Sequence, residues 1–172
     1  MWNVVEKKIT PDLMVDRISH ISPELLTKWK LKGVILDVDN TLLSKKANVP
    51  DDDIFDWVES IRPMMNIVLL SNNIPSRIHR ASMPLDLPYI GWTMKPFSWY
   101  FKKALRFLNL CPDEVGMIGD QLFTDILGAK WSGVGKTIYV RPMDLRYESC
   151  WTKCMRKLEK KVMLQWTTKS SL

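Results

Sequence analysis

The strongest constraint in this sequence is an alternation of short apolar runs with helix-like segments between about residues 33 and 140. The apolar runs are 33–37, 65–71, 87–92, 115–120 and 136–140. The segments with helical patterns are 22–31, 51–62, 75–81, 97–109 and 122–131. Strands that alternate with helices in this way predict a three-layer α/β fold built on a mainly parallel sheet.

Three of the apolar runs end in polar side chains that could carry chemistry. These residues are Asp37, Ser71 and Asp120. In open parallel sheets, ligands bind outside the carboxyl ends of the strands. We therefore expect these three side chains to converge on one edge of the sheet.

The acidic pair Asp37 and Asp39 has the spacing of oxygen ligands for a divalent cation. A calcium-binding EF-hand loop is the first alternative for such a pair. It fails because the sixth position would be Leu42 instead of Gly and the twelfth would be Asn48 instead of Glu. The residues before Asp37 also predict a buried strand, whereas an EF-hand requires a helix.

Four short motifs follow one another in the chain, each at or just after an apolar run. They are Asp37-x-Asp39-x-Thr41, Ser71-Asn72-Asn73, Lys95-Pro96 and Gly119-Asp120-x-x-x-x-Asp125. This order over about residues 32–140 resembles the four-motif signature of the haloacid dehalogenase-like (HAD) phosphatases. The local sequences are similar to the capless group, subclass III, that includes the phosphatidylglycerophosphate phosphatases. The resemblance implies a Rossmann-like HAD fold.

The resemblance also implies a role for each motif residue. Asp37 would be the nucleophile that forms an aspartyl-phosphate, and Asp39 would act as general acid and then as general base. Ser71 would donate a hydrogen bond to a phosphoryl oxygen, with Asn72 beside it as a substrate-binding residue. Lys95 would offset the negative charge of the phosphoryl group and of the nucleophile.

The same resemblance implies Mg²⁺ as cofactor. Its ligands would be the carboxylates of Asp37 and Asp120 and the backbone carbonyl of Asp39. Asp125 would orient Lys95 or a metal-bound water. Two simpler interpretations remain open from the residues alone: Ser71 as a cap of the next helix, and Asp125 as a surface acid in the first turn of a helix.

The spacing of the motifs leaves no room for a cap domain. Only 31 residues separate Asp39 from Ser71, and 23 separate Ser71 from Lys95. Neither segment is long enough for a folded domain. We expect an open active site, which suits a phosphate presented by a lipid headgroup, a protein or a nucleic-acid end.

Basic charge is concentrated at the end of the sequence. Residues 146–172 hold seven Lys or Arg and two Glu, whereas residues 1–145 hold 18 basic and 17 acidic residues. We divide the chain into a phosphatase domain, 1–145, and a basic amphipathic tail, 146–172. One helical stripe in the tail consists of Tyr147, Trp151, Met155, Leu158, Val162 and Trp166. Such a helix either lies on an anionic membrane surface or packs its stripe on the domain.

An open site and a basic tail together favour phosphatidylglycerophosphate as substrate, converted to phosphatidylglycerol at an anionic membrane surface, and disfavour nucleic acid. Three cysteines and no pattern of a secretory signal indicate a reducing compartment. We expect peripheral membrane association on the cytoplasmic or organelle-matrix side. The alternatives are the same chemistry on a soluble or macromolecular phosphoester, and a catalytically silent binding module.

Overall fold

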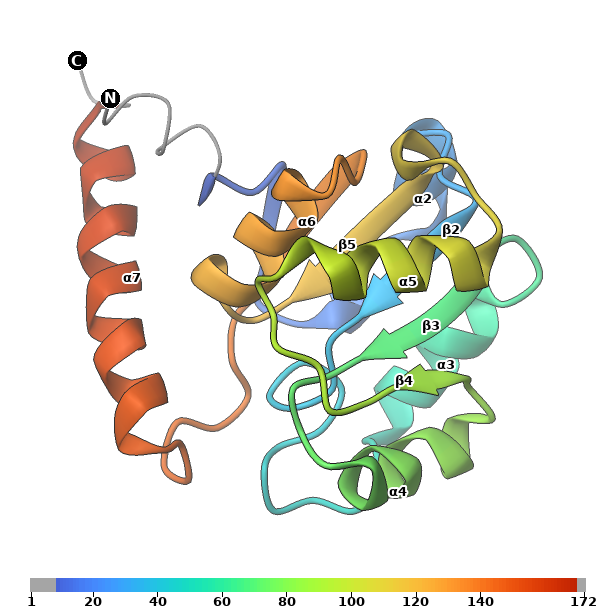
Figure 1. Ribbon diagram of the computed structural model, residues 1–172, viewed down its shortest axis with the longest axis horizontal. Helices are drawn as coiled ribbons and strands as arrows, with labels where there is room; N and C mark the ends of the chain where they lie inside the picture. The colour runs from blue at the N-terminus through green and yellow to red at the C-terminus, as the bar shows by residue number, and fades with distance from the viewer. Residues whose placement is uncertain (1–8, 170–172) are drawn as a thin grey trace.

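Six parallel strands form one sheet in the order β1-β6-β5-β2-β3-β4 (Figure 1). The structure is a computed structural model that describes residues 9–169. The strands are β1 (Leu13–Val15), β2 (Gly33–Leu36), β3 (Asn66–Leu70), β4 (Tyr89–Ile90), β5 (Val115–Gly119) and β6 (Lys136–Val140). The predicted α/β class and parallel sheet are confirmed.

The register of the central strands places their carboxyl ends side by side. Leu36 of β2 pairs with Leu69 of β3 and with Ile118 of β5. The next residue, Asp37, continues the ladder, because its backbone N–H donates to the carbonyl of Ile118 over 2.9 Å. The polar residues that follow these strands therefore reach the same edge.

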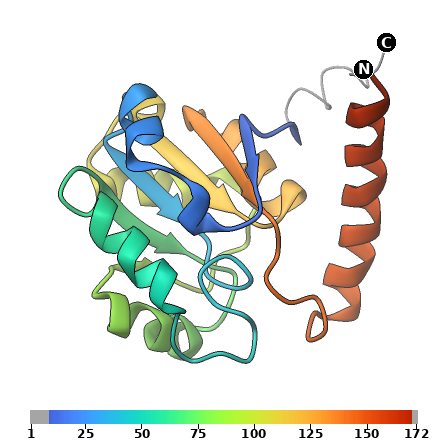
Figure 2. The same ribbon diagram turned by 180° about the vertical axis from the view of Figure 1, so that it is seen from behind.

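Helices cover both faces of the sheet, so the fold has three layers. They are α2 (Pro23–Lys28), α3 (Asp52–Ile61), α4 (Pro75–Leu85), α5 (Ser98–Leu108) and α6 (Leu127–Trp131). Figures 1 and 2 show α5 on one face of the sheet and α3 on the other. The shorter helical segments are η1 (Ile18–His20), η2 (Pro112–Glu114) and η3 (Leu122–Ile126).

Alternate residues of the strands supply two separate hydrophobic cores. Val34 and Leu36 pack with residues of α2, α3 and α4. Ile35 packs with residues of α5 and α6 on the other face. All four residues of β2 are buried, as expected for a central strand of a parallel sheet.

The elements differ from the prediction mainly at their ends. The helix predicted at 22–31 is shorter, Pro23–Lys28, and Ser22 caps it by accepting a hydrogen bond from the N–H of Leu25. The helix predicted at 75–81 continues to Leu85 and ends at Asp86, whose φ is 45°. Strand β1 was not predicted. It has only three residues, none of them fully buried, at the edge of the sheet. So short a segment shows no recognisable apolar run.

The helix predicted at 122–131 is divided. Its first part is the π-helical η3, and α6 begins at Leu127. At the start of η3, Gln121 N–H donates to Asp125 and Leu122 N–H donates to Glu159 over 2.6 Å. Side chains thus satisfy the first N–H groups of this segment, and π-helical turns of this kind are frequent at functional sites.

The basic tail contains a long helix, α7 (Cys150–Lys169), at one side of the sheet (Figures 1 and 2). Its buried residues include Arg156, Glu159 and Val162, whereas Trp151 and Leu158 of the predicted stripe are exposed. The face of α7 that meets the body therefore includes Val162 of the stripe but leaves Trp151 and Leu158 outside. Met163 and Trp166 pack on a small cluster formed by Leu122, Ile126 and Tyr139.

Charged residues also lie on the buried face of α7. The Arg156 guanidinium contacts the carboxylate and the backbone carbonyl of Asp120, and it lies 3.0 Å from oxygens of both Glu148 and Glu159. Glu148 also accepts from Asn40 Nδ2 over 3.2 Å. Burial lowers the pKa of Arg156, but the carboxylates of Asp120 and Glu159 outweigh it and raise the pKa above the ordinary value.

Within residues 9–169, no helix combines the length and the apolar character that crossing a bilayer requires.

The Arg156 network predicts a large effect on stability. Arg156→Met would leave Asp120, Glu148 and Glu159 without their cation, and breaking a buried ion pair from one side costs about 3–5 kcal/mol. Urea denaturation monitored by circular dichroism measures this loss. Lys157→Met, at the exposed neighbour on the same helix, should change the free energy of unfolding by less than about 0.5 kcal/mol. Equal stability of the two variants would contradict a structural role for Arg156.

Candidate active site

The expected polar residues meet at the carboxyl edge of the sheet. Asp37 follows β2, Ser71 follows β3 and Asp120 follows β5, while Lys95 comes from the connection between β4 and α5. All four are less than 9% exposed. Folding therefore brings together residues that are up to 83 positions apart, because the parallel strands all end at the same edge of the sheet.

Lys95 is the central cation of this group. Its Nζ lies 2.5 Å from Asp37 Oδ1 and 2.7 Å from Asp125 Oδ1, and it donates to the carbonyl of Leu70 over 2.9 Å. Burial lowers the pKa of Lys95, but Asp125 and Asp37 outweigh burial and raise that pKa above its ordinary value. Lys95 is therefore a buried lysine that carries a positive charge beside Asp37.

The Asp37 carboxylate is buried beside other acids. Burial raises the pKa of Asp37 to about 7, with a further contribution from the charge of Asp125, while Lys95 opposes the increase. Thr41 Oγ1 lies 3.4 Å from Asp37 Oδ2, a long hydrogen bond. A carboxylate with few hydrogen-bond donors around it keeps a lone pair available for a ligand or a reaction.

Asp125 is fully buried, so the interpretation as a surface acid is wrong. It accepts from the N–H of Gln121 over 3.1 Å and contacts Lys95. A Cβ atom at Gly119 would lie 2.5 Å from Asp125 Oδ2, so only glycine allows this approach of η3 to the end of β5. The arrangement matches a role for Asp125 in orienting Lys95.

Three buried carboxylates form a cluster with the geometry of a cation site. One oxygen from each of Asp37, Asp120 and Asp125 lies within 4.8 Å of the others. Asp120 Oδ2 contacts Arg156, whereas Asp120 Oδ1 is buried without a hydrogen-bond partner among the described residues. Burial raises the pKa of Asp120 well above its ordinary value. A hard divalent cation fits these oxygen donors and would compensate the buried charge.

The Asp39 carboxylate points to a different part of the site. Asn73 Nδ2 donates to Asp39 Oδ2 over 3.0 Å, and Arg77 Nη2 lies 3.3 Å from Asp39 Oδ1. Arg77 also donates to the carbonyls of Ser44 and Ala47. These contacts hold the Asp39 side chain away from the carboxylate cluster. The expected metal contact of Asp39 through its backbone carbonyl stays a prediction.

Ser71 and Asn72 shape the loop after β3. Ser71 Oγ accepts from the N–H of Asn73 over 3.2 Å, a local turn that leaves its hydroxyl hydrogen available to a phosphoryl oxygen. Asn72 Oδ1 accepts from Thr93 Oγ1 and from the N–H of Lys95, both over 2.8 Å. Asn72 therefore ties the loop after β3 to the segment that carries Lys95.

A cavity of about 540 Å³ opens beside these residues. Asp37, Asp39, Ser71, Asn72 and Lys95 line it. Further lining residues are Lys45, Asn73, Ile74, Arg77, Arg80, Gln121, Thr124, Trp151 and Thr152. Only α3 lies between β2 and β3, and only α4 between β3 and β4, so no cap domain covers the cavity in the described part of the chain.

Sequence reasoning missed several residues that shape the site. Asn73, the last residue of the Ser71 motif, and Arg77, four residues after it, hold Asp39, a role that the sequence analysis did not assign to either. Arg156 contacts Asp120 from 36 residues away, and its position within a run of basic residues gave no signal of this. Trp151 and Thr152 also reach the cavity from α7.

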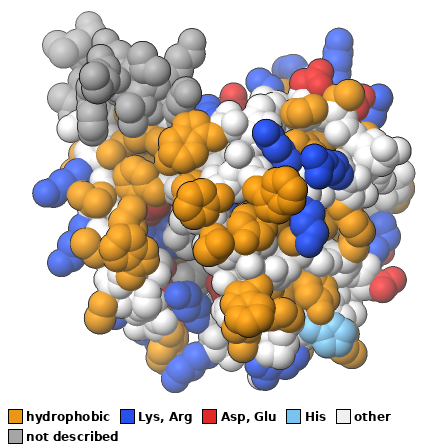
Figure 3. Space-filling view, viewed as in Figure 1, with side chains coloured by type: hydrophobic (Ala, Val, Ile, Leu, Met, Phe, Trp, Pro, Cys, Tyr) orange, Lys and Arg blue, Asp and Glu red, His pale blue; other side chains and the backbone are white. Residues whose placement is uncertain are grey.

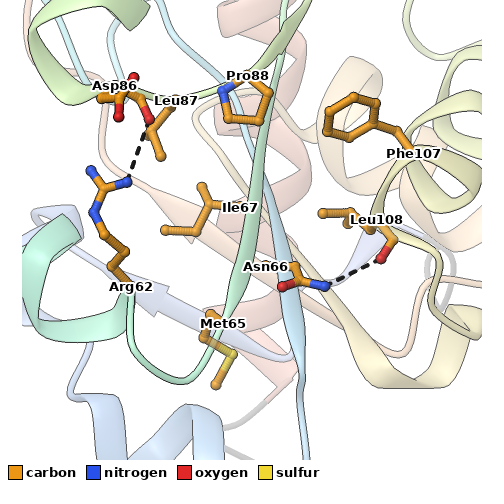
Figure 4. A pocket seen from close by; sticks show the side chains of 9 residues that line it. All are labelled: Arg62, Met65, Asn66, Ile67, Asp86, Leu87, Pro88, Phe107 and Leu108. Atoms are coloured by element: carbon orange, nitrogen blue, oxygen red, sulfur yellow. Dashed lines mark hydrogen bonds between the residues drawn. The ribbon is translucent and has the colours of Figure 1, made fainter.

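A second hollow, of about 280 Å³, lies where β3 begins (Figure 4). Arg62 lies 3.4 Å from the carbonyl of Asp86, and Asn66 donates to the carbonyl of Leu108 over 3.3 Å. This hollow is at the amino edge of the sheet, opposite to the motif residues. Its one acidic lining residue, Asp86, gives no basis for a second catalytic site.

Two family models match complementary parts of the chain. The model described as Mitochondrial PGP phosphatase matches residues 3–83, which include Asp37, Asp39 and Ser71. The model described as HAD-hydrolase-like matches residues 93–141, which include Lys95, Asp120 and Asp125. Each motif residue thus falls in a segment with the sequence pattern of a HAD family.

Relatives extend the match over nearly the whole chain. The chain is 32% identical to the "Probable phosphatase YqeG" of Bacillus subtilis over 161 residues, 93% of this chain and 92% of that protein. A HAD-like hydrolase from Xanthomonas campestris has a similar fold, with a TM-score of 0.50, 13% identity, and coverage of 91% of this chain and all of that one.

The HAD-hydrolase YfnB of Bacillus subtilis, in a structure bound to magnesium, also shares the fold. Its TM-score is 0.50 and its identity 17%, over 61% of this chain and 50% of that one. The sheet order, the four motifs at its carboxyl edge and the full-length relative agree, and this chain belongs to the haloacid dehalogenase-like phosphatases.

Proposed function

We propose that this chain is a Mg²⁺-dependent phosphomonoesterase that forms an aspartyl-phosphate on Asp37 and acts on phosphatidylglycerophosphate at a membrane surface. The observation that carries the proposal is the buried Asp37 carboxylate, which lies 2.5 Å from Lys95 Nζ and borders an open cavity of about 540 Å³. A phosphate group at this place would meet a nucleophile and a fixed cation together.

In the first step, an Asp37 oxygen forms a bond to phosphorus while the bond between phosphorus and the ester oxygen breaks. The leaving alkoxide takes a proton from Asp39, which Asn73 and Arg77 hold at the cavity. In the second step, Asp39 accepts a proton from water, whose oxygen attacks the aspartyl-phosphate. Inorganic phosphate leaves and Asp37 is regenerated.

The charges around the reacting group have separate tasks. Lys95 stabilises negative charge on the phosphoryl oxygens, and Asp125 holds the Lys95 ammonium in position. The Ser71 hydroxyl donates to a phosphoryl oxygen. Asp37 and Asp120 would hold Mg²⁺ with the carbonyl of Asp39, and the ion would reduce the repulsion between the carboxylate and the phosphate dianion.

Three observations support a lipid substrate. One matching family model is that of a PGP phosphatase. No cap domain covers the cavity within residues 9–169. The helix α7 exposes Lys153, Lys157, Lys160 and Lys161. Exposed cations attract anionic lipid surfaces. On this proposal the protein works as a peripheral protein on the cytoplasmic or organelle-matrix side of a membrane.

Phosphate release from phosphatidylglycerophosphate in mixed micelles tests the proposal directly. The wild type should release phosphate only with Mg²⁺, and Asp37→Asn should reduce the rate at least about a thousandfold, because an amide cannot act as the nucleophile. An aryl phosphate is assayed beside the lipid. Phosphate release from the aryl phosphate alone would contradict the lipid substrate. Phosphate release from neither compound would contradict phosphatase activity.

A second prediction concerns pH and Mg²⁺. The pKa of Asp37, about 7 because of burial, exceeds the ordinary value of an unfolded chain, so its protonated form stabilises the metal-free protein at low pH. This contribution is lost as pH rises through about 7. Mg²⁺ requires the ionised carboxylate. The increase in Tm caused by Mg²⁺ should therefore be larger at pH 8 than at pH 5.5.

Asp37→Asn is the control for this measurement. It removes the titrating group, so the difference between the two pH values should shrink in the variant. A Mg²⁺-induced increase in Tm that is the same at both pH values in the wild type would contradict the assignment of Asp37 as a ligand.

A further inference from the structure

Large apolar side chains are exposed around Lys95. Trp92, Met94, Phe97 and Trp99 are each between 59% and 71% exposed, all within eight residues. Contiguous exposed apolar groups of this size are uncommon on soluble surfaces and mark interaction sites. The space-filling view shows hydrophobic side chains gathered over the start of α5 and the connection before it, with Lys and Arg beside them (Figure 3).

Hydrogen bonds hold the backbone of this segment, which we call the 92–99 segment. The N–H of Trp92 donates to Asn73 over 2.9 Å, and that of Thr93 donates to Ser71 over 3.2 Å. The N–H of Lys95 donates to Asn72. Thr93 and Lys95 are buried, whereas Trp92 and Met94 are exposed. The exposed apolar side chains and the buried Lys95 thus belong to one segment that hydrogen bonds hold at the site.

The exposed residues adjoin the candidate active site. The partner of Trp92, Asn73, lines the cavity that contains Asp37. Two more exposed apolar residues, Ile74 from the loop after β3 and Trp151 from α7, line the same cavity. Apolar groups thus surround the opening through which a phosphate would reach Asp37.

Charge in the body of the chain is strongly segregated. Residues 60–112, which form β3, α4, β4 and α5, contain one acidic residue, Asp86. The same residues contain seven cations: Arg62, Arg77, Arg80, Lys95, Lys102, Lys103 and Arg106. The rest of residues 1–145 has 11 basic and 16 acidic residues. The net charge of residues 1–145 is therefore close to zero only because a positive region, which includes the 92–99 segment, is balanced by an acidic remainder.

Exposed Trp and Phe among Lys and Arg match the chemistry of an anionic bilayer surface. Aromatic rings lie at the level of the lipid headgroups, and neighbouring cations attract anionic lipids. One such neighbour is Arg106, whose guanidinium lies 5.6 Å from the ring centre of Trp99. A protein partner or a second copy would use the apolar groups but would have less need of a region so depleted in acids.

We infer that the 92–99 segment is the surface by which this protein docks on a bilayer containing anionic phospholipid, with the cavity of Asp37 facing the lipid headgroups. The inference rests on the proposed function for its substrate, and it goes further by locating the contact in the segment of Lys95. The α7 cations then add attraction at the side of the docked surface.

Sedimentation of the full chain with vesicles tests the inference. Vesicles of phosphatidylcholine with phosphatidylglycerol are compared with vesicles of phosphatidylcholine alone. The wild type should bind the anionic vesicles, and the double variant Trp92→Ser with Phe97→Ser should bind them at least about tenfold more weakly, since two large apolar contacts are lost. Neither residue lines the cavity.

Trp131→Ser is the matched control. Trp131 is 53% exposed at the end of α6, at the opposite edge of the sheet, and its loss should leave vesicle binding unchanged. Circular dichroism verifies that each variant folds. Equal binding by the double variant and the wild type, or no binding by the wild type, would overturn the inference. The inference would also be overturned, in favour of self-association, if the wild type does not bind vesicles but forms a dimer that the double variant does not form.

Hydrolysis of a soluble aryl phosphate separates this inference from the proposed function. Retained Mg²⁺-dependent hydrolysis in the double variant, together with lost vesicle binding, supports both. Vesicle binding that depends on Trp92 and Phe97 in a protein without any phosphatase activity would support the docking surface and remove the proposed function. Hydrolysis of the aryl phosphate without any vesicle binding would support phosphatase activity and contradict the docking surface.

Discussion

Two buried cations hold together a group of buried carboxylates, and the positions of several elements depend on this balance of charge. Lys95 lies between Asp37 and Asp125, and Arg156 contacts Asp120 together with Glu148 and Glu159. Charges withdrawn from water are costly unless they are paired. Each cation therefore holds its own segment at the carboxyl edge of the sheet. Lys95 holds the connection before α5, and Arg156 holds the helix α7.

The two cations do not neutralise the five carboxylates around them. Three of these carboxylates, Asp37, Asp120 and Asp125, lie in one cluster, and one oxygen of Asp120 has no hydrogen-bond partner among the described residues. A protein can compensate such an excess by protonation or by a bound cation. The elevated pKa values of Asp37 and Asp120 and the proposed Mg²⁺ are two responses to the same buried charge.

The sequence was most informative where local pattern and position coincide. Strands β2, β3 and β5 are apolar runs that are each followed by a motif residue, so both the parallel sheet and its active edge could be predicted. The helical pattern at 122–131 is confirmed, but the segment begins as a π-helix, and the N–H of Leu122 at its start donates to Glu159. Glu159 is distant in sequence, and hydrophobic periodicity does not report such a contact.

The tail illustrates the same limit. Its apolar stripe suggested which face would pack, but Trp151 and Leu158 are exposed while Arg156 and Glu159 are buried. The pattern of a helix records how hydrophobic each position is, and it gives no information about a buried carboxylate elsewhere in the chain. Asp120 supplies that missing partner. Arg156 was therefore interpreted as a surface charge, although it is buried and its guanidinium contacts Asp120.

The 92–99 segment connects the chemistry to the direction from which a substrate would arrive. Thr93 and Lys95 are buried in this segment, whereas Trp92 and Met94 are exposed. Hydrogen bonds from the backbone of the segment to the loop after β3 hold both kinds of residue in place. If these outward groups contact a bilayer, the protein is oriented with its open cavity toward the headgroups whenever Lys95 is in place. Absence of a cap domain is then an advantage, since the lipid surface itself would exclude bulk water from the reacting phosphate.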